Sequence, residues 1–556
     1  MTPAYRLRIE TKRTPLVEKT AALFTRALAE RAGLAVTAAD DGASPADLTM
    51  AIRPGPGTDG FAIAPDGRGG WTVTGYDERG LLYGVGRFLH NGRFALGAFT
   101  PGTWQGTDLP RLAVRGMYFA THFHNFYHDA PLEAVCRYVE DLALWGCNAL
   151  TVWFDMHHYT GTDDPAAQAM IRRLHAILHA ANGVGMGAGL VVLANEAYST
   201  SPVSLRAEPF PHHYHVEICP TRPGGLDLIL KWRRETFDAF ADLNLEHFWI
   251  WPYDQGGCKC PDCKPWGGNG FVRTAEAVGR LARQVFPRAK TIISTWEFGY
   301  WEGDPEWARF YEVMAGAPDW ADYNMAEGHG DFPPYVLRHG KPGGLPLLNF
   351  PEISMSGMSP WGGFGANLQP ARLQKVWTSC APLLSGGFPY SEGIFEDLNK
   401  VVCLQLYWNP ARPVKTIVRD YAAAEADPAV ADDVAQAVYR LEQNMNHGVD
   451  VKAAAPYRMA AVREPQVPFD LLDGARRRLM PAAQAAWRWR LLWLRAALDL
   501  ELTRSGGRPT DQTDAWFDEI GHISHADGAE WSVCIPGRRC MQRMLRGENA
   551  GWQAPT

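Results

Sequence analysis

The feature that most constrains the fold is a series of eight short apolar runs within residues 109–410. The runs are Val114–Ala120, Ala149–Phe154, Gly187–Ala194, His247–Pro252, Thr291–Thr295, Trp320–Met325, Leu345–Phe350 and Leu383–Pro389. Helical spacing of apolar residues separates most of them, at Leu132–Trp145, Ala166–Ala181, Leu226–Leu243 and Thr274–Val285. Eight strands with intervening helices are typical of a (β/α)8 barrel, whereas a doubly wound sheet does not need eight units so regularly spaced. We therefore predict an α/β fold with a central (β/α)8 TIM barrel.

The segments on either side of the barrel have different patterns. Residues 1–108 predict a small α/β domain, with strands at Tyr5–Ile9, Asp47–Ile52 and Gly70–Thr74 and helices at Leu16–Ala32 and Asp77–Gly92. The Gly- and Pro-rich stretch Pro101–Arg111 predicts a linker. Residues 411–556 predict a helical domain, from the spacing in Val414–Ala424, Ala429–Asn446 and Pro481–Leu502. A Trp/Arg-rich helix such as the last of these can also lie on a membrane surface, but its position inside the chain favours core packing.

Composition narrows the class of protein. The 556 residues are 46% hydrophobic and 21% charged, which indicates a globular protein of several domains. A net charge of -7 without a sustained Lys/Arg run argues against a nucleic-acid partner. The N-terminus lacks the apolar stretch of a signal peptide, and no run has the ~20 apolar residues needed to span a bilayer. We therefore expect a cytoplasmic protein with no membrane partner, and the helical C-terminal domain is compatible with a homodimer.

Acidic and aromatic residues follow nearly every predicted strand. In chain order they are His122 and His124, Asp155 and His157, Asn195 and Glu196, Tyr253 and Asp254, Trp296 and Glu297, Glu327 and His329, Glu352, and Tyr390 and Glu392. Because the active site of a (β/α)8 barrel lies at the carboxyl ends of its strands, these side chains are expected to converge on one ring. A single such residue is often a helix cap or a solvated loop carboxylate, but a ring of seven carboxylates is not explained by capping alone.

This ring suits glycoside hydrolysis, which needs one carboxylic acid to protonate the leaving oxygen and a second carboxylate. We predict Asp254, Glu297 and Glu392 as the chemical set, with Glu352 in reserve. The remaining strand-end residues are predicted to bind the sugar by hydrogen bonds or ring stacking: His122, Asp155, Glu196, Tyr253, Trp296, Glu327, Glu352 and Tyr390. A metal-dependent hydrolase using His122, His124 or His157 is a weaker alternative.

A second specific feature is the knuckle Cys258-Lys-Cys260-Pro-Asp-Cys263. Three thiols within six residues can fold around one tetrahedral ion, and Cys219 is the natural fourth ligand. We predict one structural zinc ion, because four thiolates leave no open position for catalysis; a cluster of free thiols is the alternative. No Gly-x-Gly-x-x-Gly motif follows a strand, so no organic cofactor is expected.

The segment ERGLLYGVGRFL followed by LAVRGMYFA resembles glycoside hydrolase family 20, with similarity also to families 67 and 84. The resemblance implies a small α/β domain that ends in a Tyr-Gly helix and precedes a catalytic barrel. It also implies a sugar contact for the arginine of the Arg-Gly pair, which here is Arg115. Family 20 carries an Asp-Glu pair after the fourth strand, with Glu as the acid, whereas this chain has Asp254-Gln255. Glutamine cannot supply that proton, so the resemblance implies a distant or separate family.

The first hypothesis is therefore an exo-acting, β-N-acetylhexosaminidase-like glycoside hydrolase for a small sugar or oligosaccharide. An α-glucuronidase-like or other exo-glycosidase is the alternative within the same class. A non-catalytic carbohydrate-binding barrel is the alternative from another class, and Gln255 favours it.

Overall fold

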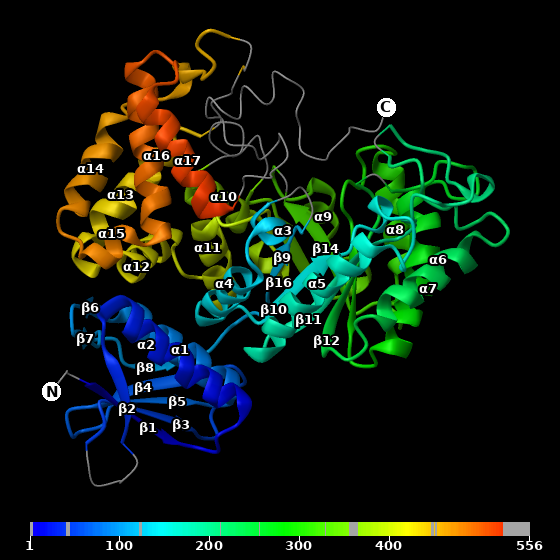
Figure 1. Cartoon of the computed structure of the whole chain (residues 1–556). Coiled ribbons are helices and arrows are strands. Elements are labelled where there is room, and N and C mark those ends of the chain that lie inside the picture. Colours follow the sequence, from blue (N-terminus) through cyan, green and yellow to red (C-terminus); the bar gives the residue numbers. More distant parts are fainter. Residues whose placement is uncertain are drawn as a thin grey trace.

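The computed structural model describes residues 4–39, 45–121, 125–211, 213–254, 256–328, 330–354, 365–445, 450 and 453–525. Figure 1 shows an N-terminal sheet with two helices, a central barrel, and a group of C-terminal helices on the side of the barrel where the N-terminal unit also lies. The predicted fold class is confirmed.

The N-terminal unit is a six-stranded sheet of order β2-β1-β3-β5-β4-β8 with helices packed against it. Its strands are β1 (Ala4–Glu10), β2 (Ala35–Ala38), β3 (Leu48–Ile52), β4 (Phe61–Pro65), β5 (Trp71–Gly75) and β8 (Gly106–Asp108); its helices are α1 (Pro15–Ala32) and α2 (Glu78–Asn91). A separate hairpin joins β6 (Arg93–Ala95) to β7 (Ala98–Thr100). The linker predicted at Pro101–Arg111 therefore needs correction, because it contains β8, which pairs with β4.

Eight parallel strands close the barrel, since the first pairs with both the second and the eighth. They are β9 (Val114–Phe119), β10 (Ala149–Trp153), β11 (Gly187–Leu193), β12 (Leu245–Trp251), β13 (Lys290–Ser294), β14 (Tyr323–Gly328), β15 (Leu347–Pro351) and β16 (Leu384–Gly387), and the short β17 (Tyr390–Ser391) continues beside β9. The helices between them are α3 (Phe126–Asp129), α4 (Leu132–Leu144), α5 (Pro165–Gly183), α6 (Gly225–Asp238), α7 (Gly270–Val285), α8 (Asp304–Met314), α9 (Pro334–His339), α10 (Pro370–Cys380) and α11 (Asp397–Trp408).

The C-terminal part is helical as far as the structure describes it. Its helices are α12 (Val414–Glu425), α13 (Ala431–Glu442), α14 (Gln466–Arg476), α15 (Pro481–Ala485), α16 (Trp487–Arg504) and α17 (Asp511–Ser524). The single helix predicted over Pro481–Leu502 is wrong in one respect, because Ala486 is extended and divides it into α15 and α16. Leu494, Ala496 and Leu498 of α16 are almost fully buried, which agrees with core packing. Among the described residues, no helix is long and apolar enough to cross a membrane.

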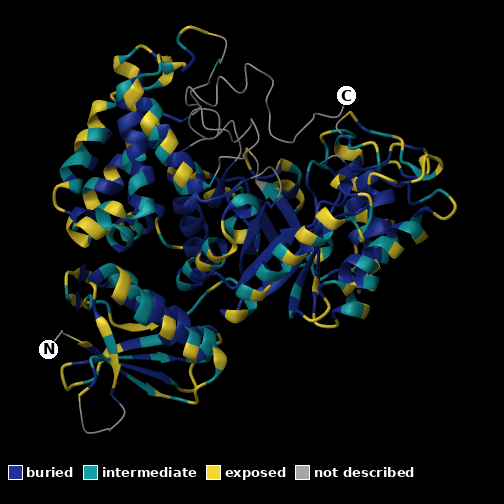
Figure 2. Ribbon diagram, viewed as in Figure 1, coloured by how far each residue is buried: buried dark blue, intermediate teal, exposed yellow. Residues whose placement is uncertain are grey.

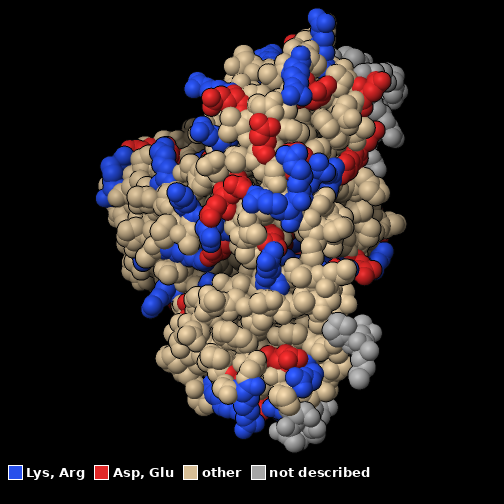
Figure 3. All heavy atoms as spheres, turned by 90° about the vertical axis from the view of Figure 1, so that its left-hand side faces the viewer, with Lys and Arg blue, Asp and Glu red and all other residues tan. Residues whose placement is uncertain are grey.

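Burial follows the layers of the fold. Figure 2 shows the barrel strands buried, with exposed residues concentrated on the outer sides of helices and in loops. On the face drawn in Figure 3, basic and acidic side chains are interspersed rather than segregated into a field of one sign. This face therefore lacks the broad basic stripe that a nucleic-acid partner would require.

Arg115 joins the barrel to the N-terminal unit. It lies near the start of β9, is 1% exposed, and donates from Nη2 to Asp59 Oδ2 at 2.6 Å, from Nε to the Gly146 carbonyl and from Nη1 to the Leu112 carbonyl. Its guanidinium also lies over the rings of Tyr83 and Trp408. The sugar contact that the family resemblance implied for Arg115 is therefore wrong. The side chain lies at the amino end of its strand, away from the strand ends that form the site, and its guanidinium donates to Asp59 and to two backbone carbonyls.

Candidate active site

The strand ends bring the predicted carboxylates together around Tyr118, the penultimate residue of β9. Tyr118 is fully buried, and burial together with the charges of Asp254, Asp155, Glu196 and Glu392 raises its pKa well above the usual value. Four carboxylates from four different strand ends thus act on one phenol. Its hydroxyl has no hydrogen-bond partner among the described residues.

Asp254, Glu297 and Glu327 follow three consecutive strands and form the most closely coupled group. Burial and the charge of Glu297 raise the pKa of Asp254 to about 7. The Glu297 backbone N–H donates to Glu327 Oε2 at 3.2 Å, and burial raises the pKa of Glu327 to about 7 as well. All three side chains remain partly exposed, so they are accessible to a ligand.

The backbone at two of these positions is in the left-handed region. Asp254 has φ 67° and Glu297 has φ 58°, a conformation that costs a residue other than glycine roughly 1–3 kcal/mol. Such strain persists where the surrounding structure imposes it, and it clusters at functional sites. The two strand ends therefore hold their carboxylates in unusual, imposed orientations.

Glu196 and Asp155 follow β11 and β10, and each has a histidine partner. Glu196 is 1% exposed and accepts from His157 Nδ1 at 2.8 Å and from Trp153 Nε1 at 3.2 Å, and burial raises its pKa to about 8. Burial lowers the pKa of His157 to about 3, and Tyr214 stacks on the His157 ring with 3.5 Å between centroids. Asp155 pairs with His158 at 2.8 Å.

Glu352 and Glu392 follow the last two barrel strands. Glu352 is fully buried, accepts from the Ser354 backbone N–H at 2.8 Å, and forms an isolated bridge with Tyr390. The Tyr390 hydroxyl donates to Glu392 Oε1 at 2.8 Å. Glu392 is thus part of the ring, since its charge acts on Tyr118 together with those of Asp254, Asp155 and Glu196.

An aromatic floor closes the barrel beneath the ring. Tyr118, Trp249, Trp251, Trp296, Phe350 and Tyr390 pack mostly edge to face, with centroids 4.8–5.9 Å apart. Trp296 and Tyr390, both predicted to bind sugar, belong to this floor and are each 7% exposed. Tyr253 needs correction: it is 1% exposed and its hydroxyl donates to Glu306, so it does not face a ligand.

Several predicted positions lie outside the described residues. They are His122, His124, Gln255 and His329. Their roles, including that of Gln255 in place of the family 20 acid, remain predictions.

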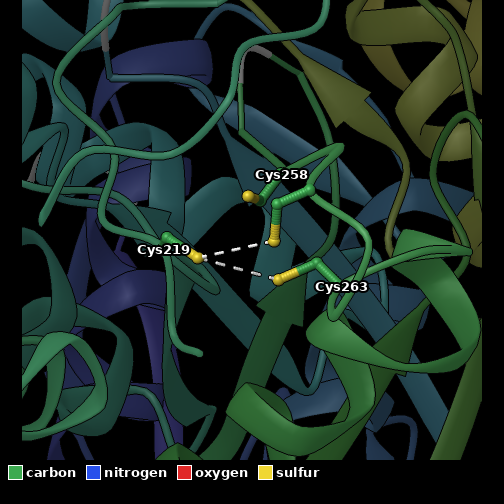
Figure 4. A group of neighbouring side chains, drawn as sticks. Cys219, Cys258 and Cys263 are labelled. Atoms are coloured by element: carbon green, nitrogen blue, oxygen red, sulfur yellow. Dashed lines mark hydrogen bonds between the residues drawn. The ribbon is translucent and has the colours of Figure 1, made fainter. Parts of the chain in front are cut away.

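The predicted cysteine cluster assembles from two neighbouring loops. Cys219 comes from the loop after β11, and Cys258, Cys260 and Cys263 come from the loop after β12; one ligand atom of each lies within 4.8 Å of all the others. Figure 4 shows the labelled sulfur atoms around one common space. The Sγ of Cys219 is 3.8 Å from that of Cys260 and 3.9 Å from that of Cys263. Zn–S bonds of about 2.3 Å in a tetrahedron separate the sulfur atoms by about 3.8 Å, so the four cysteines can hold a metal such as zinc.

The sequence does not indicate that Tyr118, Tyr214 and Glu306 belong to the site. Tyr118 lies inside an apolar run, where a tyrosine is hard to distinguish from a core residue. Glu306 lies in the first turn of α8, where an acidic residue is common for helix stability alone. Tyr214 lies in a histidine-rich loop whose path the sequence does not indicate.

The sequence matches no model of a known protein family and no curated protein. The structure is similar to a family GH115 4-O-methyl-α-glucuronidase, with TM-score 0.60 and 10% identity over 100% of this chain and 80% of that chain. It is similar to the Streptomyces plicatus β-hexosaminidase in complex with its product GlcNAc, with TM-score 0.54 and 14% identity over 78% of this chain and 91% of that chain. A GH89 enzyme from Clostridium perfringens, in complex with GlcNAc-α-1,4-galactose, aligns with TM-score 0.59 and 10% identity over 91% of this chain and 64% of that chain. The chain therefore has the fold of these glycoside hydrolases, and the similarity is too distant to assign it to one of their families.

Proposed function

We propose that this chain is an exo-acting glycoside hydrolase, β-N-acetylhexosaminidase-like in specificity, in which Asp254 and Glu297 carry the chemistry. The observation that supports this most strongly is the pair itself. Two carboxylates on adjacent strand ends share a strained backbone conformation, and burial together with the charge of Glu297 raises the pKa of Asp254 to about 7. A pair of carboxylates, one of them with a raised pKa that keeps it protonated, is the usual catalytic arrangement of glycosidases.

In the proposed reaction, the protonated Asp254 carboxyl group donates its proton to the glycosidic oxygen as the bond to the anomeric carbon breaks. The Glu297 carboxylate stabilises the positive charge that develops on the sugar ring. It then either bonds to the anomeric carbon or removes a proton from the attacking water, and the anomer of the released sugar distinguishes these two routes. Glu327, whose carboxylate accepts from the Glu297 backbone N–H, and Glu392, whose carboxylate accepts from the Tyr390 hydroxyl, are proposed to bind sugar hydroxyls.

The GH115 similarity spans the whole chain, and it favours an α-glucuronidase-like activity as the second candidate. Both candidates are tested together with a panel of fluorogenic aryl glycosides that includes β-N-acetylglucosaminides, α-N-acetylglucosaminides and α-glucuronides. We expect release of the aglycone from one member of the panel, with the β-N-acetylglucosaminide as first choice. Binding of sugars without any release would contradict the proposal and favour the carbohydrate-binding barrel.

We also propose that Cys219, Cys258, Cys260 and Cys263 bind one structural zinc ion. The spacing of the sulfur atoms supports this, and four thiolate ligands leave no open coordination position for substrate or water. Elemental analysis of protein purified without added metal is expected to give one zinc per chain. In the Cys219→Ser/Cys260→Ser double variant the zinc content is expected to fall by about tenfold or more, because a structural site needs all its ligands. A wild-type protein with four titratable free thiols at these positions and no metal would contradict it.

A further inference from the structure

The loops that carry Asp254 and Glu297 are both bonded to one carboxylate that belongs to neither loop. Glu306, in the first turn of α8, is fully buried. Its Oε1 accepts from the Tyr253 hydroxyl at 2.5 Å and from the Gly267 backbone N–H at 2.8 Å. Its Oε2 accepts from the Gly299 backbone N–H at 2.8 Å.

Two of these three donors are close in sequence to the proposed catalytic residues. Tyr253 immediately precedes Asp254, and Gly299 comes two residues after Glu297. Both carboxylates lie where the backbone is in the left-handed region, so the loops need an external restraint to keep them there. Three hydrogen bonds to one buried group supply such a restraint.

Neighbouring contacts reinforce the same connection. Trp266 donates from its backbone N–H to Glu302 Oε2 at 2.5 Å and from Nε1 to the Pro252 carbonyl at 2.7 Å. Trp307, next to Glu306, donates from Nε1 to the Phe298 carbonyl at 3.1 Å. A side chain at position 267 would approach the Glu306 carboxylate to 2.7 Å and the Phe298 ring to 2.5 Å, so the close approach needs glycine there.

We infer that Glu306 is a positioning residue of the active site, whose carboxylate fixes the Asp254 loop and the Glu297 loop relative to each other. The inference rests on the proposed function for its effect on turnover, but the bridge between the loops can be tested without it. Glu306 itself reaches neither the substrate nor the reacting atoms, because it lies behind Tyr253.

The decisive variant is Glu306→Gln, which keeps the size of the side chain. An amide has one accepting oxygen, so its NH2 group must face either Gly267 N–H or Gly299 N–H, and at least one loop is released. The matched control is Glu312→Gln on the same helix, which removes only an exposed ion pair with Arg309. Tyr253→Phe is the milder second variant, because it deletes one hydroxyl and frees only the Asp254 side.

Two readouts are measured on folded protein. Hydrogen exchange by mass spectrometry is expected to accelerate about tenfold at residues 256–257 and 297–303 in Glu306→Gln, since lost bonds open the loops locally. With the substrate identified by the glycoside panel, kcat is expected to fall about 10- to 100-fold while KM changes less than about threefold, because misplaced groups act on the transition state. In Tyr253→Phe, kcat is expected to fall less than in Glu306→Gln, and hydrogen exchange is expected to accelerate only around residues 252–257. In Glu312→Gln, both kcat and exchange are expected to match the wild type.

Wild-type exchange and wild-type kcat in folded Glu306→Gln would overturn the inference. If Glu306→Gln does not fold, Tyr253→Phe carries the test alone, and unchanged exchange around Asp254 with unchanged kcat would overturn it. If the wild type hydrolyses no glycoside, the proposed function fails, while the exchange data still decide whether Glu306 joins the loops.

Discussion

Replacing Arg115 is expected to destabilise the fold without weakening the binding of a sugar, because its guanidinium bonds to Asp59 and to two backbone carbonyls. The family resemblance gives it a sugar contact, whereas the structure places it between the barrel and Asp59, away from the carboxylate ring. The test is Arg115→Met, which keeps the apolar stem of the side chain and removes the charge and all the donors.

The expected loss of stability follows from the partners of Arg115. Removing one member of a buried ion pair costs about 3–5 kcal/mol, because the other charge is left buried. Asp59 is 3% exposed, but it keeps Arg79 at 2.7 Å on its other oxygen, which offsets part of that cost. The carbonyls of Gly146 and Leu112 each lose a donor, at about 1 kcal/mol or more. We therefore expect the free energy of unfolding to fall by about 3–5 kcal/mol.

The assay is urea unfolding followed by far-UV circular dichroism, with KM measured on the fraction that stays folded. Arg280→Met is the matched control, since Arg280 forms exposed ion pairs with Glu276 and Asp319, and its loss is expected to leave the free energy of unfolding close to the wild-type value. Asp59→Asn combined with Arg115→Met should cost less than the sum of the single changes, because the two side chains share one interaction. An Arg115→Met protein with wild-type stability and a KM raised more than about tenfold would contradict this expectation and would indicate that Arg115 contacts the sugar.

Three further predictions follow from the ring. Burial raises the folded-state pKa of Glu196 to about 8, so its contribution to stability is present below about pH 4.5 and is lost as pH rises toward 8. Glu196→Gln should therefore gain stability relative to the wild type over that pH range. Unfolding midpoints of the two proteins that change in parallel with pH would contradict this. If Asp254 is the acid, kcat/KM should decline as pH rises through about 7, the pKa of its carboxyl group, and a profile that is flat from pH 5 to 9 would exclude it. Tyr118→Phe should change the free energy of unfolding by less than about 1 kcal/mol, since the hydroxyl has no partner among the described residues, yet it should raise KM if that hydroxyl binds the sugar.

The barrel was predictable because eight buried strands impose a repeated apolar pattern. The strand-end rule then predicted that Asp254, Glu297 and Glu327 lie near one another, and the structure places them so. Boundaries were less predictable. The run Trp320–Met325 includes Trp320, which is buried but precedes the strand Tyr323–Gly328, so its apolar character reflects burial rather than strand position. β8 was missed because it is an edge strand of only three residues in a Gly- and Pro-rich segment, and its strand character follows only from its pairing with β4.

The parts of the site that the sequence could not reveal are the relations between side chains. The sequence around Glu306 does not distinguish a positioning residue that connects two loops from an ordinary acidic residue in the first turn of a helix. Arg115 is the second residue of the predicted run Val114–Ala120, so the strand-end rule already argued against the sugar contact that the family resemblance implied. The cysteine ligands were predictable because three of them are close in sequence and the fourth comes from the adjacent barrel loop.

The central claim is that Asp254 and Glu297 hydrolyse a glycosidic bond. It is tested most directly by the turnover of Asp254→Asn and Glu297→Gln on the best glycoside of the panel, with Glu276→Gln, an exposed residue of α7, as the control. We expect each active-site variant to fold normally and its kcat to fall by about 10²- to 10⁴-fold, while kcat of the control keeps the wild-type value. Wild-type turnover in either folded active-site variant would contradict it.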